Sequence, residues 1–431
     1  MLKTFKNAWK IEDIRKKIIF TAFVLVIYRL GCAIAVPFIQ PSALKSMIAA
    51  GDGNMLGYLN LISGGAFANA TLFALGVIPY INSSIIITLL TVAIPYLENL
   101  SKEGEEGRKK IAKITRYVAV VIAFVLAFGY YFVLKNHNAL IYTKGAAGFF
   151  AAVVIISSFV AGSMLLMWMG EQIDKKGIGN GVSLIIFTGI ISRMSVTVSL
   201  FVGMFQQAMN GKTLNYILIP LFIIFAIAVI AFAVILNNAE RRIPVQYAKR
   251  VVGRKMMGGQ STHLPIKVNM SGVMPVIFAG SIMSLPGTII SFFNIKNEIA
   301  DKILSIFDYN GIVYAIGYVM LIIAFNYFYV TMQYNPVEIA NNLRKNNGVI
   351  PGFRPGKQTQ DFIARVLSKL TFIGAVFLAV VAILPIITGN LTKVGIQLGG
   401  TSILIVVGVA LEVAQQLESQ MVMRHHKGFL E

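Results

Sequence analysis

Residues that carry enzyme chemistry are scarce in this sequence. It has one cysteine and four histidines among 431 residues, and only 13% of its residues are charged. The single cysteine, Cys32, excludes an internal disulfide and is expected to pack in the protein interior. The histidines (His137, His263, His425 and His426) all fall outside the apolar runs. No Ser/His dyad or HExxH zinc pair therefore lies within a predicted span, which argues against an intramembrane enzyme.

Signals for a nucleotide or a metal are missing too. The glycine-rich stretch GIGNG at residues 177–181 lacks the Lys-Ser/Thr pair that follows the glycines of a phosphate-binding loop. Adjacent His425 and His426 supply too few ligands for a closed metal site. We therefore expect no enzyme activity, no cofactor and no metal in this chain, so that energy for any transport comes from outside it.

Apolar residues, in contrast, dominate the sequence. Hydrophobic residues make up 56% of the chain, and the mean hydropathy is +0.74. A helix that crosses a bilayer needs about 20 mostly apolar residues, and we find ten such runs. The predicted spans are residues 18–37, 75–96, 114–134, 148–169, 181–201, 215–236, 271–291, 311–333, 368–388 and 401–420. The sequence predicts an all-α polytopic membrane protein with ten transmembrane helices.

The basic residues indicate the orientation of these spans. If the amino terminus is cytoplasmic, the segments predicted to be cytoplasmic hold 29 of the 38 Lys and Arg residues and the exported segments, counting Arg193 near the end of the fifth span, hold 8. The remaining one, Arg29, lies inside the first span. Basic residues concentrate in cytoplasmic loops of membrane proteins. The pattern therefore favours cytoplasmic amino and carboxy termini and an even number of spans.

Two of the cytoplasmic loops are longer than a connection requires. Residues 237–270 alternate basic and β-prone residues around Gly258 and Gly259, which predicts a projecting hairpin. Residues 334–370 contain two Pro-Gly-type turns around Arg354. One interpretation is that both loops only anchor the protein to anionic lipid. Their length favours an additional role as a docking surface.

Two short motifs recur five spans apart. Gly76–Ile81 and Gly272–Ile277 share Gly-Val-x-Pro-x-Ile in the second and seventh spans, and Gly181–Ile186 and Gly400–Ile405 share Gly-x-Ser-x-x-Ile in the fifth and tenth. An odd number of spans per repeat reverses the topology, so the motifs indicate inverted repeats. This symmetry would place four isoleucines around one axis, with Ile85 and Ile190 one helical turn further on. Together they suggest an aliphatic collar at mid-depth.

Six ordered stretches resemble the SecY family, the channel subunits of the bacterial protein-export translocon, and the resemblance covers the whole chain. The stretches are SGGAFANATLFALGVIPYINSSIII, EQIDKKGIGNGVS, RRIPVQYAKR, GGQSTHLPIKVN, NPVEIANNLRKNNGVIPGFRPGKQT and GGTSILIVVGVALE. The resemblance implies two inverted five-helix halves, residues 1–201 and 202–431, around a central hourglass pore. It also implies a lateral opening between spans two and three and spans seven and eight, and a short re-entrant plug helix near residues 59–71.

The resemblance further implies three groups of functional residues. The pore ring maps to Ile81, Ile85, Ile186, Ile190, Ile277 and Ile405. The plug maps to Ser63, Gly64, Gly65, Ala66, Phe67, Ala68, Asn69 and Ala70. Docking of a motor or ribosome maps to Arg241, Arg242, Lys249, Arg250, Arg254 and Arg354, whose charges suit acidic proteins and rRNA phosphates alike. The implied partners are the SecE and SecG membrane subunits, the SecA motor ATPase, the ribosome, preprotein signal sequences and lipid, and the implied location is the bacterial cytoplasmic membrane.

The main alternative is a secondary solute transporter, which can also use inverted repeats and broken helices. Transporters place charged or strongly polar groups at mid-depth, whereas this sequence places isoleucines there. Two charged residues within spans, Arg29 and Glu412, leave the question open. Each is expected either to pair or snorkel, or to take part in moving a proton or ion. Arg29 is also positioned to cap backbone carbonyls near the exported side.

Overall fold

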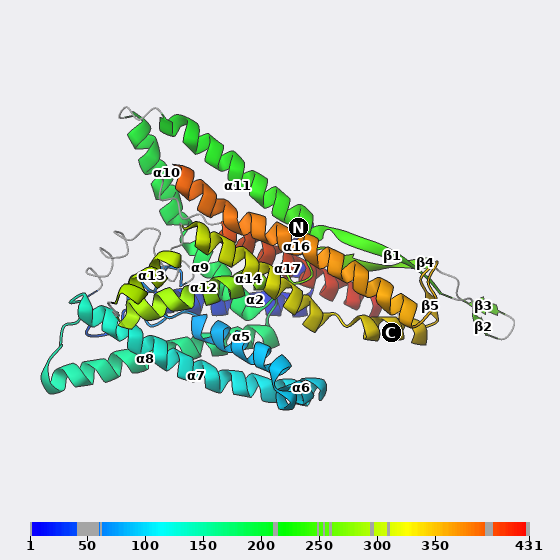
Figure 1. Cartoon of the computed structure of the whole chain (residues 1–431), viewed down its shortest axis with the longest axis horizontal. Coiled ribbons are helices and arrows are strands. Elements are labelled where there is room, and N and C mark those ends of the chain that lie inside the picture. The colour runs from blue at the N-terminus through cyan, green and yellow to red at the C-terminus, as the bar shows by residue number, and fades with distance from the viewer. Residues whose placement is uncertain are drawn as a thin grey trace.

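Long helices make up most of the computed structural model (Figure 1). Residues described by the structure are 2–40, 60, 63–209, 214–247, 250–252, 255–257, 261–293, 297–307, 311–392 and 400–427. The helices are α1 (Leu2–Lys10), α2 (Glu12–Gly31), α5 (Ile78–Ala93), α6 (Pro95–Lys102), α7 (Glu105–Asn136), α8 (Gly145–Lys176), α9 (Gly181–Ser192), α10 (Met194–Met209), α11 (Leu214–Asn238), α12 (Met274–Phe293), α13 (Glu298–Ile306), α14 (Ile312–Gln333), α15 (Pro336–Lys345), α16 (Lys357–Thr392) and α17 (Gly400–Lys427).

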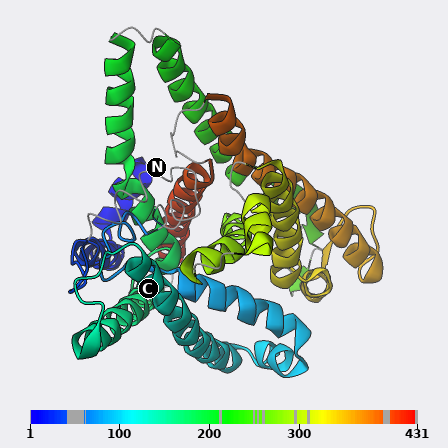
Figure 2. The same ribbon diagram turned by 60° about the vertical axis from the view of Figure 1, so that its left-hand side comes forward.

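The helices match the ten predicted spans in order. Within the described residues, seven helical stretches are long and apolar enough to cross a membrane, and the bent pair α5 and α6 makes an eighth. The shorter apolar helix α12 corresponds to the predicted seventh span. Helix α2 corresponds to the first span, although its first turns carry the charged run EDIRKK. Figure 2 shows α17, in red, between the blue helices and the yellow-to-orange helices, while the light-blue α5 lies next to the yellow-green helices.

Two predicted spans differ in detail from the structure. The span at 75–96 was expected to continue to its end, but the chain bends by 99° between α5 and α6. Pro95 is at the start of α6, where its missing N–H costs no helical hydrogen bond. The span at 181–201 is interrupted at Arg193, between α9 and α10.

The two sequence repeats have matching local structure. Gly76 and Gly272 both adopt left-handed backbone conformations, with φ of 58° and 63°. In each case a helix begins two residues later, at Ile78 and at Met274. Pro79 therefore lies in the first turn of α5, where its missing N–H costs no helical hydrogen bond. The members of the other motif pair also begin helices, α9 at Gly181 and α17 at Gly400.

The loop at residues 237–270 forms the predicted hairpin. Strands β1 (Glu240–Tyr247) and β4 (Ser261–Lys267) pair in antiparallel register and lead to a tip that extends beyond the helices (Figure 1). Strands β2 (Arg250–Val252) and β3 (Lys255–Met257) pair further out. Strand β5 (Gly348–Val349), from the second long loop, pairs with the other edge of β1. The two loops therefore form one projecting unit, a connection that the sequence did not reveal.

Several contacts bring predicted cytoplasmic segments together at one end of the molecule. Ala8 of α1, Ile178 and Leu417 of α17 belong to one small buried cluster. Near the base of the hairpin, the amino group of Lys267 donates a hydrogen bond to Oε1 of Gln415, also in α17. Helix α1, the later turns of α17 and the hairpin base therefore lie together at one end of the molecule.

Candidate functional site

The six isoleucines of the predicted ring come from four helices, α5, α9, α12 and α17. All six are buried, with exposed fractions between 2% and 7%. All belong to one hydrophobic cluster that links the two halves of the chain. Helices α5 and α12 pack against each other, as do α9 and α17. The fold thus gathers these side chains from distant parts of the sequence.

The segment predicted as a plug packs into the same cluster. Its side chains Ala66, Phe67 and Ala70 are at most 2% exposed and contact the buried core. Residues 63–70 form consecutive turns, whereas the resemblance implied a short helix there. Asn60 stabilises these turns, because its side-chain oxygen accepts a hydrogen bond of 3.0 Å from the backbone N–H of Ala68.

Helices on two sides hold this segment. The hydroxyl of Tyr130 in α7 donates a 2.6 Å hydrogen bond to the carbonyl of Phe67, and the two rings stack with centroids 4.4 Å apart. The ring of Phe292 in α12 lies parallel to that of Phe67 at 6.5 Å. Just after the segment, the hydroxyl of Ser163 in α8 donates to the carbonyl of Gly76 at 3.1 Å. These partners satisfy backbone groups that would otherwise be buried without hydrogen bonds.

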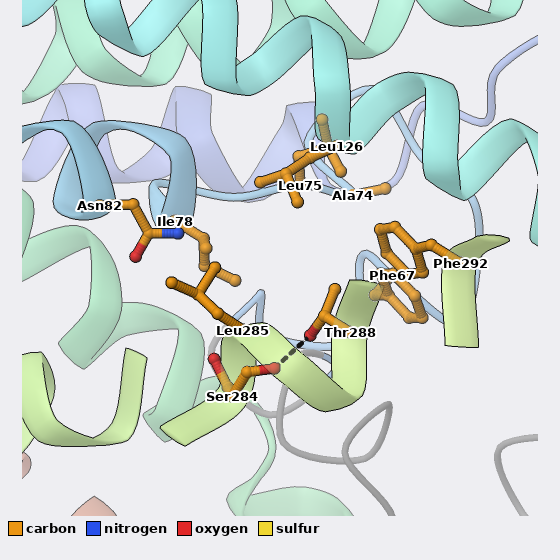
Figure 3. Close-up of a pocket in the computed structure, with 10 residues that line it drawn as sticks. All are labelled: Phe67, Ala74, Leu75, Ile78, Asn82, Leu126, Ser284, Leu285, Thr288 and Phe292. Atoms are coloured by element: carbon orange, nitrogen blue, oxygen red, sulfur yellow. Dashed lines mark hydrogen bonds between the residues drawn. The ribbon is translucent and has the colours of Figure 1, made fainter. Parts of the chain in front are cut away.

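A pocket lies where α5, α7 and α12 meet (Figure 3). Its polar residues are Asn82 on α5 and Ser284 and Thr288 on α12, and Phe67 lines it from the plug segment. The Oδ1 atom of Asn82 is buried without a hydrogen-bond partner among the described residues. The hydroxyl of Thr288 donates to the carbonyl of Ser284 in its own helix at 2.8 Å. The seam between α5 and α12 therefore combines a few polar groups with an apolar wall.

The two charged residues within spans have identifiable surroundings. Arg29 of α2 donates hydrogen bonds to the hydroxyl of Ser192 at 2.9 Å and to the carbonyl of Gly64 at 3.4 Å. It therefore caps a backbone carbonyl, one of the two roles expected for it. Glu412 of α17 lines a second, polar pocket together with Lys267 from the hairpin base.

Four of the six predicted docking residues lie in the described parts of the projecting unit. Arg241 and Arg242 are exposed on β1, and a guanidinium nitrogen of Arg242 is 2.7 Å from a carboxylate oxygen of Glu240. Arg354 is exposed in the turns after β5. The backbone of Arg250 lies in β2, while Lys249 and Arg254 lie outside the described residues. Within the described part of the chain, no cluster of three or more His, Cys, Asp or Glu residues could hold a metal.

A sequence model of the SecY family matches residues 71–414. The chain belongs to the SecY family. Full-length relatives named protein translocase subunit SecY include those of Halalkalibacterium halodurans, 42% identical over 434 residues with 100% of both chains covered, and of Thermotoga maritima, 43% identical over 436 residues with 100% of this chain and 98% of that one covered.

Solved structures show the same fold. A structure described as a protein-conducting channel aligns with a TM-score of 0.65 at 22% identity, covering 95% of this chain and 93% of its own. Sec61 in a canine ribosome-channel complex aligns with a TM-score of 0.60 at 21% identity, covering 95% and 93%. The chain is thus a multi-pass membrane protein of the SecY fold. The SecY relatives support a protein-channel function, and they give no support to the solute-transporter alternative.

The sequence did not reveal the residues that hold the plug segment and the turn that follows it. Tyr130 and Ser163 lie in spans three and four, far along the chain from the carbonyls that accept their hydrogen bonds. A weak signal was present, because polar groups within an apolar span are costly unless they have partners. Ser284 and Thr288, in span seven, carried the same signal for the seam.

Proposed function

We propose that this SecY-family chain forms the pore through which unfolded preproteins cross the bacterial cytoplasmic membrane and from which membrane segments pass sideways into lipid. The observation that carries this proposal is the burial of six isoleucines from four helices in one cluster with the plug segment. No polar binding site for a small solute is formed by these side chains. The arrangement suits a path that is closed at rest.

The isoleucines act as a hydrophobic seal around the path. A narrow aliphatic constriction excludes ions because water leaves it, whereas a ring of charges would bind or repel parts of an arbitrary polypeptide. Isoleucine is stiff about χ1 and makes only weak, non-directional contacts. It therefore closes around a moving chain without holding it. Residues 63–70 add a second barrier, because they pack against the same cluster.

Sideways opening occurs along the seam between α5 with α7 and α12 with α14. The polar residues Asn82, Ser284 and Thr288 weaken an otherwise apolar contact between the halves (Figure 3). A hydrophobic signal sequence entering this seam would replace protein contacts by its own apolar side chains. The halves, residues 1–201 and 202–431, would then move apart as units.

Energy and targeting come from partners on the cytoplasmic side. The projecting unit of β1, β4 and β5 presents Arg241, Arg242 and Arg354 to that side. We assign it to docking of the SecA motor and of the ribosome, because exposed guanidinium groups suit acidic protein surfaces and RNA phosphates. SecE and SecG are the membrane subunits expected beside the chain. Both termini are then cytoplasmic.

A reconstituted transport assay tests this function. Vesicles that contain the purified chain with SecE and SecG should take up a preprotein only when SecA and ATP are added. A preprotein without its signal sequence should stay outside, and small solutes should not accumulate under an ion gradient. Solute uptake without preprotein entry would overturn the proposal in favour of a transporter.

A further inference from the structure

Arg29 makes a connection between three segments that are far apart in the sequence. One nitrogen of its guanidinium group, Nη1, donates to the carbonyl of Gly64 at 3.4 Å and to the hydroxyl of Ser192 at 2.9 Å. Gly64 belongs to the plug segment and Ser192 ends α9. Ser192 in turn donates to the carbonyl of Gly189 at 2.7 Å. Helix α2, the plug segment and the end of α9 are therefore joined at one point.

The backbones at this point are unusually close. A Cβ atom on Gly64 would lie 2.8 Å from the Cα of Gly189, so a side chain at position 64 has no room. Gly64 also has a positive φ of 65°, which favours glycine. The plug segment thus meets α9 at a specific, close contact, and Arg29 makes hydrogen bonds on both sides of it. Ile190, one residue beyond Gly189, is a member of the proposed pore ring.

From this geometry we propose that Arg29 is a positioning residue that latches the plug in its closed place against α9. This inference rests on the proposed role of residues 63–70 as a plug. When the plug leaves, the bond to Gly64 breaks while the bond to Ser192 stays within a fixed pair of helices. Arg29 therefore stabilises the closed state selectively, since its bond to the plug carbonyl exists only there.

A purely structural role for Arg29 makes a different prediction. An arginine that only snorkels or joins α2 to α9 would affect insertion and folding equally with the plug present or absent. A latch acts only while there is a plug to hold. The two roles are separated by combining a substitution at Arg29 with deletion of residues 63–70.

The experiment measures resting ion conductance of the reconstituted translocon in planar bilayers. Arg29→Leu should raise the conductance severalfold in the intact chain and add nothing in the chain lacking residues 63–70. Arg29→Lys should remain close to the parent, because both bonds come from one nitrogen and an ammonium group has three donors. Arg15→Leu, an exposed position at the other end of α2, is the matched control and should cause no leakage.

A second pair of variants covers the case in which Arg29→Leu fails to insert. Ser192→Ala removes one of the two acceptors and should give a smaller leak that again disappears in the deletion, whereas exposed Ser195→Ala should not leak. If Arg29→Leu raises the resting conductance by the same amount with and without residues 63–70, the latch is overturned. It is also overturned if the Arg29→Leu channel does not leak although the channel lacking residues 63–70 does. If the deletion itself does not leak, the plug assignment fails and the latch fails with it.

Discussion

Tyr130 of α7 and Phe67 of the plug segment make both a hydrogen bond and a ring-stacking contact. The tyrosine hydroxyl donates to the phenylalanine carbonyl at 2.6 Å, and the rings stack at 4.4 Å between centroids. Tyr130 is completely buried, with an exposed fraction of 0%. A phenol buried this deeply is costly without an acceptor. The pair therefore favours this position of the plug segment, because the hydroxyl and the carbonyl satisfy each other there.

Tyr130→Phe should loosen the plug without removing the stacking. The carbonyl of Phe67 would lose its partner, and an unsatisfied buried acceptor costs about 1–3 kcal/mol. If water satisfies that carbonyl once the plug moves, the open fraction should rise roughly fivefold or more. Resting conductance in planar bilayers measures this change. Tyr131→Phe is the matched control, because the Tyr131 hydroxyl has no hydrogen bond within the described residues. Equal leakage from both variants would contradict the role of the Tyr130 bond.

Gly64→Ala and Gly65→Ala separate backbone strain from close packing. Both glycines have positive φ, 65° and 88°, so alanine should cost about 1–2 kcal/mol at either place. Only at Gly64 would the new Cβ meet another backbone, 2.8 Å from Gly189 Cα, whereas at Gly65 nothing lies within 4 Å. Gly64→Ala should therefore leak more than Gly65→Ala at equal levels of inserted protein. Similar conductance of the two variants would show that the contact with α9 does not hold the plug.

Arg354→Glu should impair SecA-driven export while the protein remains inserted. The side chain is exposed, so its charge contributes little to stability. Reversal places a negative charge against an acidic partner and should weaken its binding, more strongly at low salt. ATP-dependent preprotein uptake into vesicles measures the effect, with Arg354→Gln expected to be intermediate. Normal uptake with unchanged salt dependence would indicate that this loop only anchors the protein to lipid.

Cysteine labelling tests the orientation of the chain. In a Cys32→Ala background, a cysteine at Lys144, in the connection before α8, should react with a membrane-impermeant reagent added to intact cells. A cysteine at Gly356, in the turns before α16, should react only after the membrane is permeabilised. Labelling of the Gly356 variant in intact cells would contradict cytoplasmic placement of the projecting unit.

Features set by local sequence were predictable, whereas features set by distant partners were not. Apolar run length predicted the spans, and the shared motifs indicated a repeat whose members have matching local structure after Gly76 and Gly272. The bend before Pro95 was not predicted, because a proline at the end of an apolar run indicates where a helix ends but not the direction in which the chain continues. Strand β5 was not predicted, because a strand of two residues is too short to give a β pattern in the sequence. Its partner, β1, is also about a hundred residues away.

The candidate site divides in the same way. The repeat indicated the isoleucines as a set, and the fold gathers them in one cluster. The sequence also singled out Arg29 as a charge that needs partners, but these lie 35 and 163 residues further along the chain. A single sequence contains no information about such pairs. The proposed latch role of the arginine therefore rests on the structure and not on the sequence.

Conductance of ring variants tests the central claim most directly. Ile81→Asn and Ile405→Asn place an amide in the buried cluster, and a wetted constriction should conduct ions at rest. Ile87→Asn is the matched control, because Ile87 lies on the same helix as Ile81 and is equally buried, 4% against 5% exposed, but is not a member of that cluster. We predict severalfold higher resting conductance for the two ring variants and little change for Ile87→Asn, at equal amounts of inserted channel. Equal conductance of Ile81→Asn and Ile87→Asn, or no increase at either ring position, would contradict a seal formed by these isoleucines.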